Sequence, residues 1–136
     1  MTTTTKRPGA LSRLAATCLA AALVTTVVAG TTVQASVSRE RQHGSCQGPG
    51  HWTLGARHQS GHLRVRFAVT DVDPHETWQV FLSDNGVRIR ATSRVSGTQG
   101  SFRVRTPAHD RRGADHISAT AVNAGDGGSC QALLTI

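Results

Sequence analysis

The chain has 136 residues, a length that predicts one small domain and excludes the deep cleft of a large enzyme. Its net charge is +7 with histidine neutral, from 15 basic and 8 acidic residues. The 7 histidines add to this charge when the pH falls below about 6.5, so the charge of the protein depends strongly on pH.

The first 35 residues have the organisation of a secretory signal peptide. Three basic residues precede an apolar run over residues 14–29, and small residues, Val33 and Ala35, occupy positions −3 and −1 of a cleavage site. The run is shorter than the roughly 20 apolar residues of a membrane-spanning helix and is interrupted by threonines. We therefore expect a secreted, extracellular protein that begins at Ser36 and has no membrane segment after cleavage.

The predicted mature chain keeps two cysteines, Cys46 and Cys130, twelve arginines and no lysine. Twelve arginines against 8 acidic residues leave a net charge of +4. In an exported protein the two cysteines predict one disulfide, and closing so long a loop contributes about 4 kcal/mol in the chain-entropy model. We expect an N-terminal segment over residues 36–50 that carries Cys46, followed by a β-domain over residues 51–136.

From residue 51 onward, apolar residues alternate with polar ones at the period of β-strands. Asn85-Gly86 lies between two such runs and is a strong signal for a two-residue hairpin. No amphipathic helix is predicted after residue 35. The predicted strands begin near residues 51, 63, 78, 87, 101, 116 and 129. This spacing leaves no room for crossover helices and predicts a seven-stranded antiparallel β-sandwich.

Seven short strands with Trp78 on the third resemble the immunoglobulin-like and fibronectin type III-like sandwiches. The cysteines depart from the antibody pattern, because Cys46 precedes the first strand and Cys130 opens the last. Ser45-Cys46 near the predicted N-terminus, the segment 100–104 and the closing Cys130 are also similar to small secreted proteins of high-GC Gram-positive bacteria without an assigned function. The second resemblance implies a bacterial origin but indicates no activity or ligand.

Three predicted strands each carry two arginines that flank an apolar residue. Alternate residues share a face of a strand, so each pair is expected to point outward. The second and fifth strands are usual neighbours in such a sandwich, so four guanidinium groups would form one patch that binds phosphate or sulfate. Teichoic acid, nucleic acid and acidic polysaccharide are then candidate partners; the alternative is that the arginines only solvate an exposed face. The candidate residues are Arg64, Arg66, Arg88, Arg90, Arg103 and Arg105.

The histidines support an alternative hypothesis, an extracellular protein that binds zinc or copper. Their spacing matches no ligand motif, solvated turn and strand-edge residues explain them more simply, and no cofactor is expected. The candidate ligands are His51, His58, His62, His109, Asp110, Asp115 and His116. Acidic residues before the third strand offer oxygens to calcium, although Pro74 favours an ordinary turn. They are Asp71, Asp73 and Glu76.

No catalytic motif is present, so we expect no enzymatic activity. The Gly-x-Ser-x-Gly nucleophile elbow is absent, and the segment 125–129 is better explained as a glycine-rich turn. Only Phe81 among the aromatic residues falls on the outward side, where a loop or another secreted protein would cover it. Trp52, Phe67, Trp78 and Phe102 fall inward. The sequence thus predicts a secreted binding or structural module.

Overall fold

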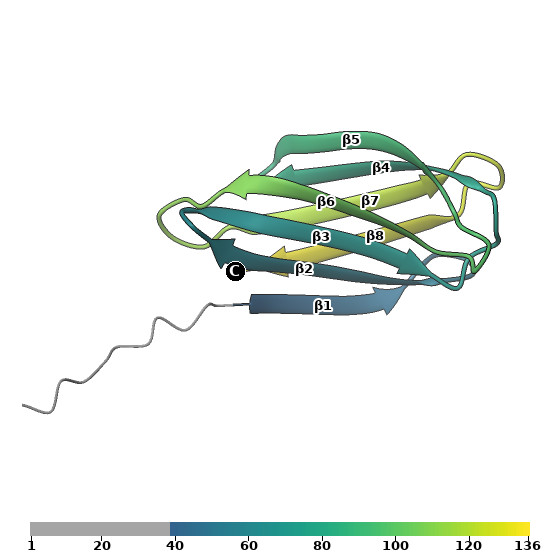
Figure 1. Ribbon diagram of the computed structural model, residues 1–136, viewed down its shortest axis with the longest axis horizontal. Coiled ribbons are helices and arrows are strands. Elements are labelled where there is room, and N and C mark those ends of the chain that lie inside the picture. Colours follow the sequence, from purple (N-terminus) through teal and green to yellow (C-terminus); the bar gives the residue numbers. More distant parts are fainter. Residues whose placement is uncertain (1–38) are drawn as a thin grey trace, which may run out of the picture. The chain divides into compact units, whose positions relative to one another are not determined.

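A computed structural model describes residues 39–136, whose regular structure consists entirely of β-strands. Two four-stranded antiparallel sheets pack face to face (Figure 1). Among the described residues, none belongs to a helix that is long and apolar enough to cross a membrane. The predicted signal peptide over residues 1–35 and the predicted N-terminus at Ser36 lie outside the described residues.

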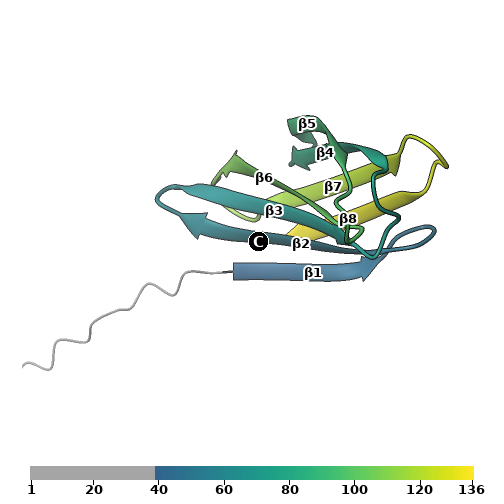
Figure 2. The same ribbon diagram turned by 45° about the vertical axis from the view of Figure 1, so that its right-hand side comes forward.

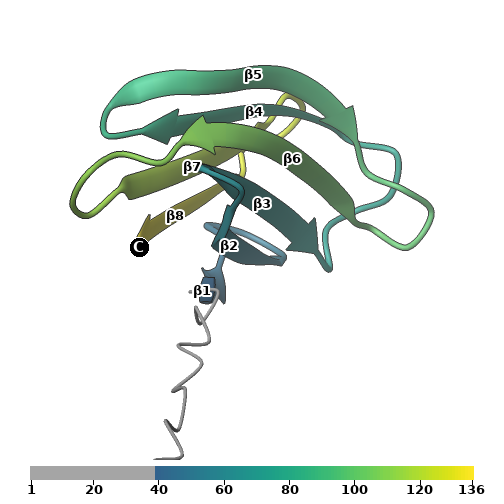
Figure 3. The same ribbon diagram turned by 60° about the vertical axis from the view of Figure 1, so that its left-hand side comes forward.

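The first sheet has the strand order β1-β2-β3-β6, and the second has the order β5-β4-β7-β8. The two layers are seen separately when the molecule is turned (Figures 2 and 3). The strands are β1 (Arg39–Ser45), β2 (His51–Gln59), β3 (His62–Thr70), β4 (Thr77–Asp84), β5 (Val87–Val95), β6 (Phe102–His109), β7 (His116–Asn123) and β8 (Ser129–Thr135).

Eight strands are present where the alternation of the sequence predicted seven. The additional strand, β1, pairs with β2 along its whole length at the edge of the first sheet. Its side chains are almost all exposed, so no hydrophobic period marks it. The other seven strands begin within one residue of the predicted positions.

The core lies between the two sheets and is filled from alternate positions of the strands. The rings of Trp78 on β4 and Phe102 on β6 lie 5.6 Å apart between centroids and so link the two layers. The inward positions predicted for Phe67, Trp78 and Phe102 are confirmed by their burial. Trp52 packs partly buried against the same core, and its indole nitrogen donates to the Ser45 carbonyl at 3.1 Å.

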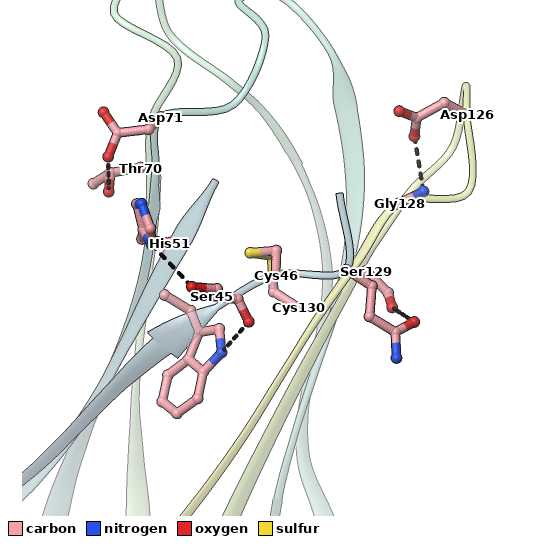
Figure 4. The surroundings of a disulfide bond; sticks show 11 residues. Ser45, Cys46, His51, Thr70, Asp71, Asp126, Gly128, Ser129 and Cys130 are labelled. Atoms are coloured by element: carbon pink, nitrogen blue, oxygen red, sulfur yellow. Dashed lines mark hydrogen bonds between the residues drawn. A yellow bond between two sulfur atoms is a disulfide. The ribbon is translucent and has the colours of Figure 1, made fainter. Parts of the chain in front are cut away.

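The predicted disulfide between Cys46 and Cys130 is confirmed, with an S–S distance of 2.03 Å (Figure 4). It joins the turn after β1 to the start of β8 and therefore ties the first sheet to the second. Next to it, the Gln47 amide donates to the Ser129 carbonyl at 2.6 Å and the Ser129 amide donates back at 3.2 Å.

The hairpin predicted at Asn85-Gly86 is also confirmed, because β4 pairs with β5 and both turn residues have positive φ, 49° and 80°. Strand β6 continues through Pro107 to His109. Proline is accepted there because β6 is an edge strand, where a missing N–H leaves no partner unpaired.

Candidate functional site

The outer face of the first sheet gathers seven arginines from all four of its strands, a surface that we call the arginine face. On β2, β3 and β6 the arginines alternate with residues that point into the core, and on β1 the register places Arg39 and Arg41 beside the outward residues of β2. Six of the seven are exposed and one, Arg57, is half-buried. The arginine face consists of Arg39, Arg41, Arg57, Arg64, Arg66, Arg103 and Arg105.

Two of the three predicted arginine pairs meet on this face. The strands that carry them, β3 and β6, are hydrogen-bonded neighbours, as the sequence predicted. Arg66 is the cross-strand partner of Arg105, whereas Arg64 faces Pro107. Direct partners have their Cβ atoms about 4.5–5.5 Å apart, so Arg66 and Arg105 place two positive charges side by side.

Three further arginines were missed by the sequence reasoning. Arg39 and Arg41 lie on β1, which the sequence did not predict as a strand. Arg57 lies near the end of β2 and is the cross-strand partner of both Arg39 and Arg64, so one row of arginines crosses three strands. A signal was present, because Arg39-Glu40-Arg41 repeats the spacing of the other pairs with a polar residue in the middle.

The third predicted pair, Arg88 and Arg90, lies in the other sheet and does not share a face. A β-bulge between Leu82 and Ser83 shifts the register, so that Arg90 lies opposite Leu82 and Arg88 opposite Ser83. Leu82 points into the core. Arg88 instead lies outside, 5.1 Å from the centre of the Phe81 ring that it covers. The alternation was misleading here because the bulge adds a residue to β5.

The arginines of this face have no carboxylate partner among the described residues. The one ion pair within residues 39–136 joins His58 Nδ1 to an Asp110 carboxylate oxygen, 2.8 Å away. Arg57 donates to Gln59 Oε1 at 3.2 Å, a neutral partner. The positive charge of the arginine face is therefore left for solvent or for a bound anion.

The arginine side chains lie close enough to affect one another. Desolvation of the exposed Arg66 guanidinium by its neighbours, followed by the positive charges of Arg103, Arg105 and Arg41, lowers the pKa of Arg66 below its ordinary value. Arg41 belongs to β1 and Arg105 to β6, so charges from both edges of the sheet act on one central side chain. An anion bound there would relieve this repulsion.

A hollow of about 560 Å³ lies in the arginine face, within the range of about 300–1,000 Å³ of ligand sites. Its lining includes all seven arginines and the small residues Thr53, Gly55, Ala68 and Thr70. Glu40 is the only acidic residue of the lining, and it pairs with the inward-facing Ala56 rather than with the arginine rows.

The outer face of the second sheet is nearly uncharged by comparison. Small, hydroxyl and amide side chains cover it, with Phe81 half-buried and Leu133 76% exposed. Arg88 and His116 are the only ionisable side chains that the described strands direct to this side. Its outward residues include Thr77, Gln79, Phe81, Ser83, Ser118, Thr120, Val122, Gln131 and Leu133.

Of the histidines proposed as metal ligands, His62 and His109 are cross-strand partners, whereas His51 and His116 lie on different sheets. No group of three or more His, Cys, Asp or Glu side chains in residues 39–136 lies close enough to hold a metal ion. His51 Nδ1 lies 3.4 Å from Ser45 Oγ (Figure 4), and His116 Nδ1 lies 3.1 Å from Thr135 Oγ1. Their contacts are with hydroxyl groups, and His58 pairs with Asp110 as described above.

Two of the three acidic residues proposed for calcium, Asp71 and Glu76, have local partners. Asp71 accepts a hydrogen bond from Thr70 at 3.0 Å (Figure 4), and Glu76 accepts one from Asn123. The glycine-rich segment 125–129 closes the turn between β7 and β8, where the Gly128 amide donates to Asp126 at 2.8 Å.

Comparison of the chain with protein-family models, with curated proteins and with solved structures finds no match. A function therefore has to be argued from the geometry and charge of this molecule. The arginine face and its hollow are the strongest concentration of one chemistry in the described residues.

Proposed function

We propose that this protein is a secreted, non-enzymatic module that binds anionic polymers through the arginine face. The observation that carries the proposal is the gathering of seven arginines on one outer sheet face with no paired carboxylate among the described residues. Guanidinium groups bind phosphate and sulfate with two parallel hydrogen bonds. Release of counterions from the polymer adds a driving force that is large at low salt.

Two features support the secreted part of the proposal. The N-terminal 35 residues have the charge and hydropathy pattern of a signal peptide. The Cys46–Cys130 disulfide is of the kind that persists in oxidising, extracellular surroundings. We also propose an immunoglobulin-like or fibronectin type III-like fold for β2–β8, supported by their division into three strands of one sheet and four of the other.

The lining of the hollow favours binding over catalysis. Arginine and small side chains predominate, and Glu40 is the only carboxylate of the lining. Thr53 has no hydrogen bond to a base among the described residues, and Thr70 donates to its exposed neighbour in the sequence, Asp71, at 3.0 Å.

A salt-dependent titration tests the proposal. We expect the protein to bind heparin and polyphosphate at low salt and to lose most of that binding by about 0.5 M salt. Changing Arg64, Arg66, Arg103 and Arg105 to glutamine should weaken binding about tenfold or more, because the variant neutralises fewer phosphates and releases fewer counterions.

A matched variant controls for net charge. Changing Arg88, Arg90, Arg111 and Arg112 to glutamine removes the same charge from exposed positions outside the arginine face. This variant should keep most of the affinity. An equal loss in both variants would show that net charge alone attracts the polymer, and an absence of binding by the parent protein at low salt would refute the proposal.

A further inference from the structure

We infer that the hollow around Gly55 is the ligand-binding site and that it binds a narrow, flexible chain of phosphate groups without bases. This inference rests on the proposed function of the arginine face and specifies its ligand. Four observations support it. They are the register around Gly55, the rows of positive charge along the hollow, the effect of the arginine charges on one another across it, and the absence of aromatic side chains from its lining.

Gly55 opens the floor of the hollow because it has no side chain in the middle of a row of arginines. Its cross-strand partners are Arg41 on β1 and Arg66 on β3. Neighbouring strands lie about 4.8 Å apart, so the strands that carry these two arginines are roughly 10 Å apart with an open floor between them. A single phosphate group over Gly55 would lie within reach of both guanidinium groups.

The hollow continues along the strands from this point. Arg57 follows Gly55 by two residues on β2 and borders the hollow at that end, whereas Thr53 extends the small-residue floor in the other direction. Residues two apart on a strand are separated by roughly 6.6 Å, so rows with positive charge follow one another at this interval. Arg103 is the cross-strand partner of Ala68, which in turn pairs with Thr53, so Arg103 adds a positive charge to the row of Thr53.

The guanidinium groups act across the floor as well as along it. The positive charge of Arg41 is one of the causes of the lowered pKa of Arg66, although Gly55 separates the two residues in the sheet. Both side chains also line the hollow. A chain of anions lying in it would contact arginines on both sides at once, which an isolated ion on a flat surface would not.

The lining argues against nucleic acids as the preferred ligand. No aromatic side chain lines the hollow, whereas proteins that bind single-stranded nucleic acid stack bases on aromatic rings. A DNA duplex is wider than the floor, since its major groove alone measures about 12 Å, so a duplex would rest on the rim without entering. A phosphate chain that lacks bases can lie on the floor itself.

Filling the hollow without removing a charge tests the inference. At Gly55 the nearest atom to an added Cβ would be the Glu40 carbonyl oxygen at 3.5 Å, an ordinary contact, and no left-handed backbone angle opposes a side chain there. Gly55→Leu should therefore fold and should weaken binding of inorganic polyphosphate about tenfold, with binding of duplex DNA changed less than twofold. The control variant Ala91→Leu adds similar bulk to an exposed position of β5 and should bind polyphosphate like the parent.

Each outcome separates this inference from the proposed function. If Gly55→Leu binds polyphosphate as tightly as the parent while the four-arginine variant does not, the inferred binding site in the hollow is wrong, and the proposed binding by the arginine face is kept. If duplex DNA or heparin loses affinity by the same factor as polyphosphate, the selectivity for a narrow phosphate chain is wrong. If the parent binds no probe, the proposed function itself fails. Should Gly55→Leu melt early, Gly55→Thr gives a smaller side chain suited to a strand and should show an intermediate loss.

Discussion

At the scale of single residues, the most unusual feature is a pair of buried carboxylates, Asp84 and Asp115, each only 1% exposed. Asp115 accepts hydrogen bonds from the Asn85 side chain at 2.8 Å and from the Arg111 amide at 3.2 Å. Asp84 Oδ1 has no hydrogen-bond partner among the described residues. Burial, with the negative charge of Asp115 as a second cause, raises the pKa of Asp84 above its ordinary value.

This raised pKa predicts how stability changes with pH. The folded protein holds the Asp84 proton at pH values where the unfolded chain has lost it, so the stability from this group is largest below the ordinary value of 3.8 and falls as the pH rises through the raised pKa. Asp84→Asn removes the buried charge, and at pH 7 it should increase the free energy of unfolding by about 1 kcal/mol. The increase should shrink towards pH 4. Thermal unfolding followed by circular dichroism at both pH values measures it.

An exposed carboxylate provides the control for Asp84. Asp73→Asn changes the same chemical group at an exposed position and should alter the melting temperature little at either pH. A lower melting temperature of Asp84→Asn at pH 7 would mean that the ionised Asp84 stabilises the fold, contrary to this account.

At the scale of elements, the β4–β5 hairpin depends on the backbone conformation of its turn. Gly86 has a φ of 80°, and nothing lies within 4 Å of a Cβ added there, so a substitution introduces backbone strain without a steric clash. Gly86→Ala should lower the free energy of unfolding by about 1–2 kcal/mol, the penalty of a left-handed conformation for an ordinary residue. Urea unfolding monitored by tryptophan fluorescence gives this value.

Gly97 offers a matched comparison for Gly86. It is also exposed, has no left-handed φ, and an added Cβ would meet the Ser101 carbonyl oxygen at 3.6 Å, an ordinary contact. Gly97→Ala should leave stability unchanged or raise it slightly, because the unfolded chain loses conformational freedom. Equal effects of the two substitutions would contradict the role assigned to the turn.

Six of the seven strands that the sequence predicted have a buried face. They could be located because Phe67, Trp78 and similar side chains alternate with polar ones, and that alternation records which face is buried. The seventh, β5, has no buried residue and follows the turn at Asn85-Gly86. The edge strand β1 buries neither face, so its residues carry no period. The bulge in β5 could not be predicted, because Arg88-Ile89-Arg90 reads as ordinary alternation and only the register shows the extra residue.

At the scale of the whole molecule, one covalent bond ties the two sheets together. The Cys46–Cys130 disulfide spans 84 residues, so it should contribute on the order of 4 kcal/mol by restricting the unfolded chain. Reduction should therefore lower the melting temperature by roughly 15–30 °C. Differential scanning calorimetry with and without a reductant tests this prediction. The variant Cys46→Ala/Cys130→Ala should melt near the reduced parent and ignore the reductant; a reduced protein that melts with the oxidised one would show that the bridge is dispensable.

The candidate site could be predicted only in part, because it belongs to the sheet and not to any single strand. The alternation of the strands and the usual strand order of a sandwich were enough to predict that Arg66 and Arg105 lie close together. The row formed by Arg39, Arg57 and Arg64 requires the register of three strands, and the hollow requires the position of Gly55 within it. Long-range register of this kind depends on strand pairing, which a single sequence does not specify.

The two sheets have unequal outer faces, and this difference would limit the number of polymer chains that one copy of the protein binds. In the proposed polymer binding, the arginines on the β1-β2-β3-β6 side would give one copy a single binding face, because within residues 39–136 the outer face on the β5-β4-β7-β8 side is almost uncharged. Copies bound in succession along a chain would coat it and turn their neutral, hydroxyl-rich sides to the surroundings. Such a protein would mask the charge of an anionic polymer without gelling or precipitating it.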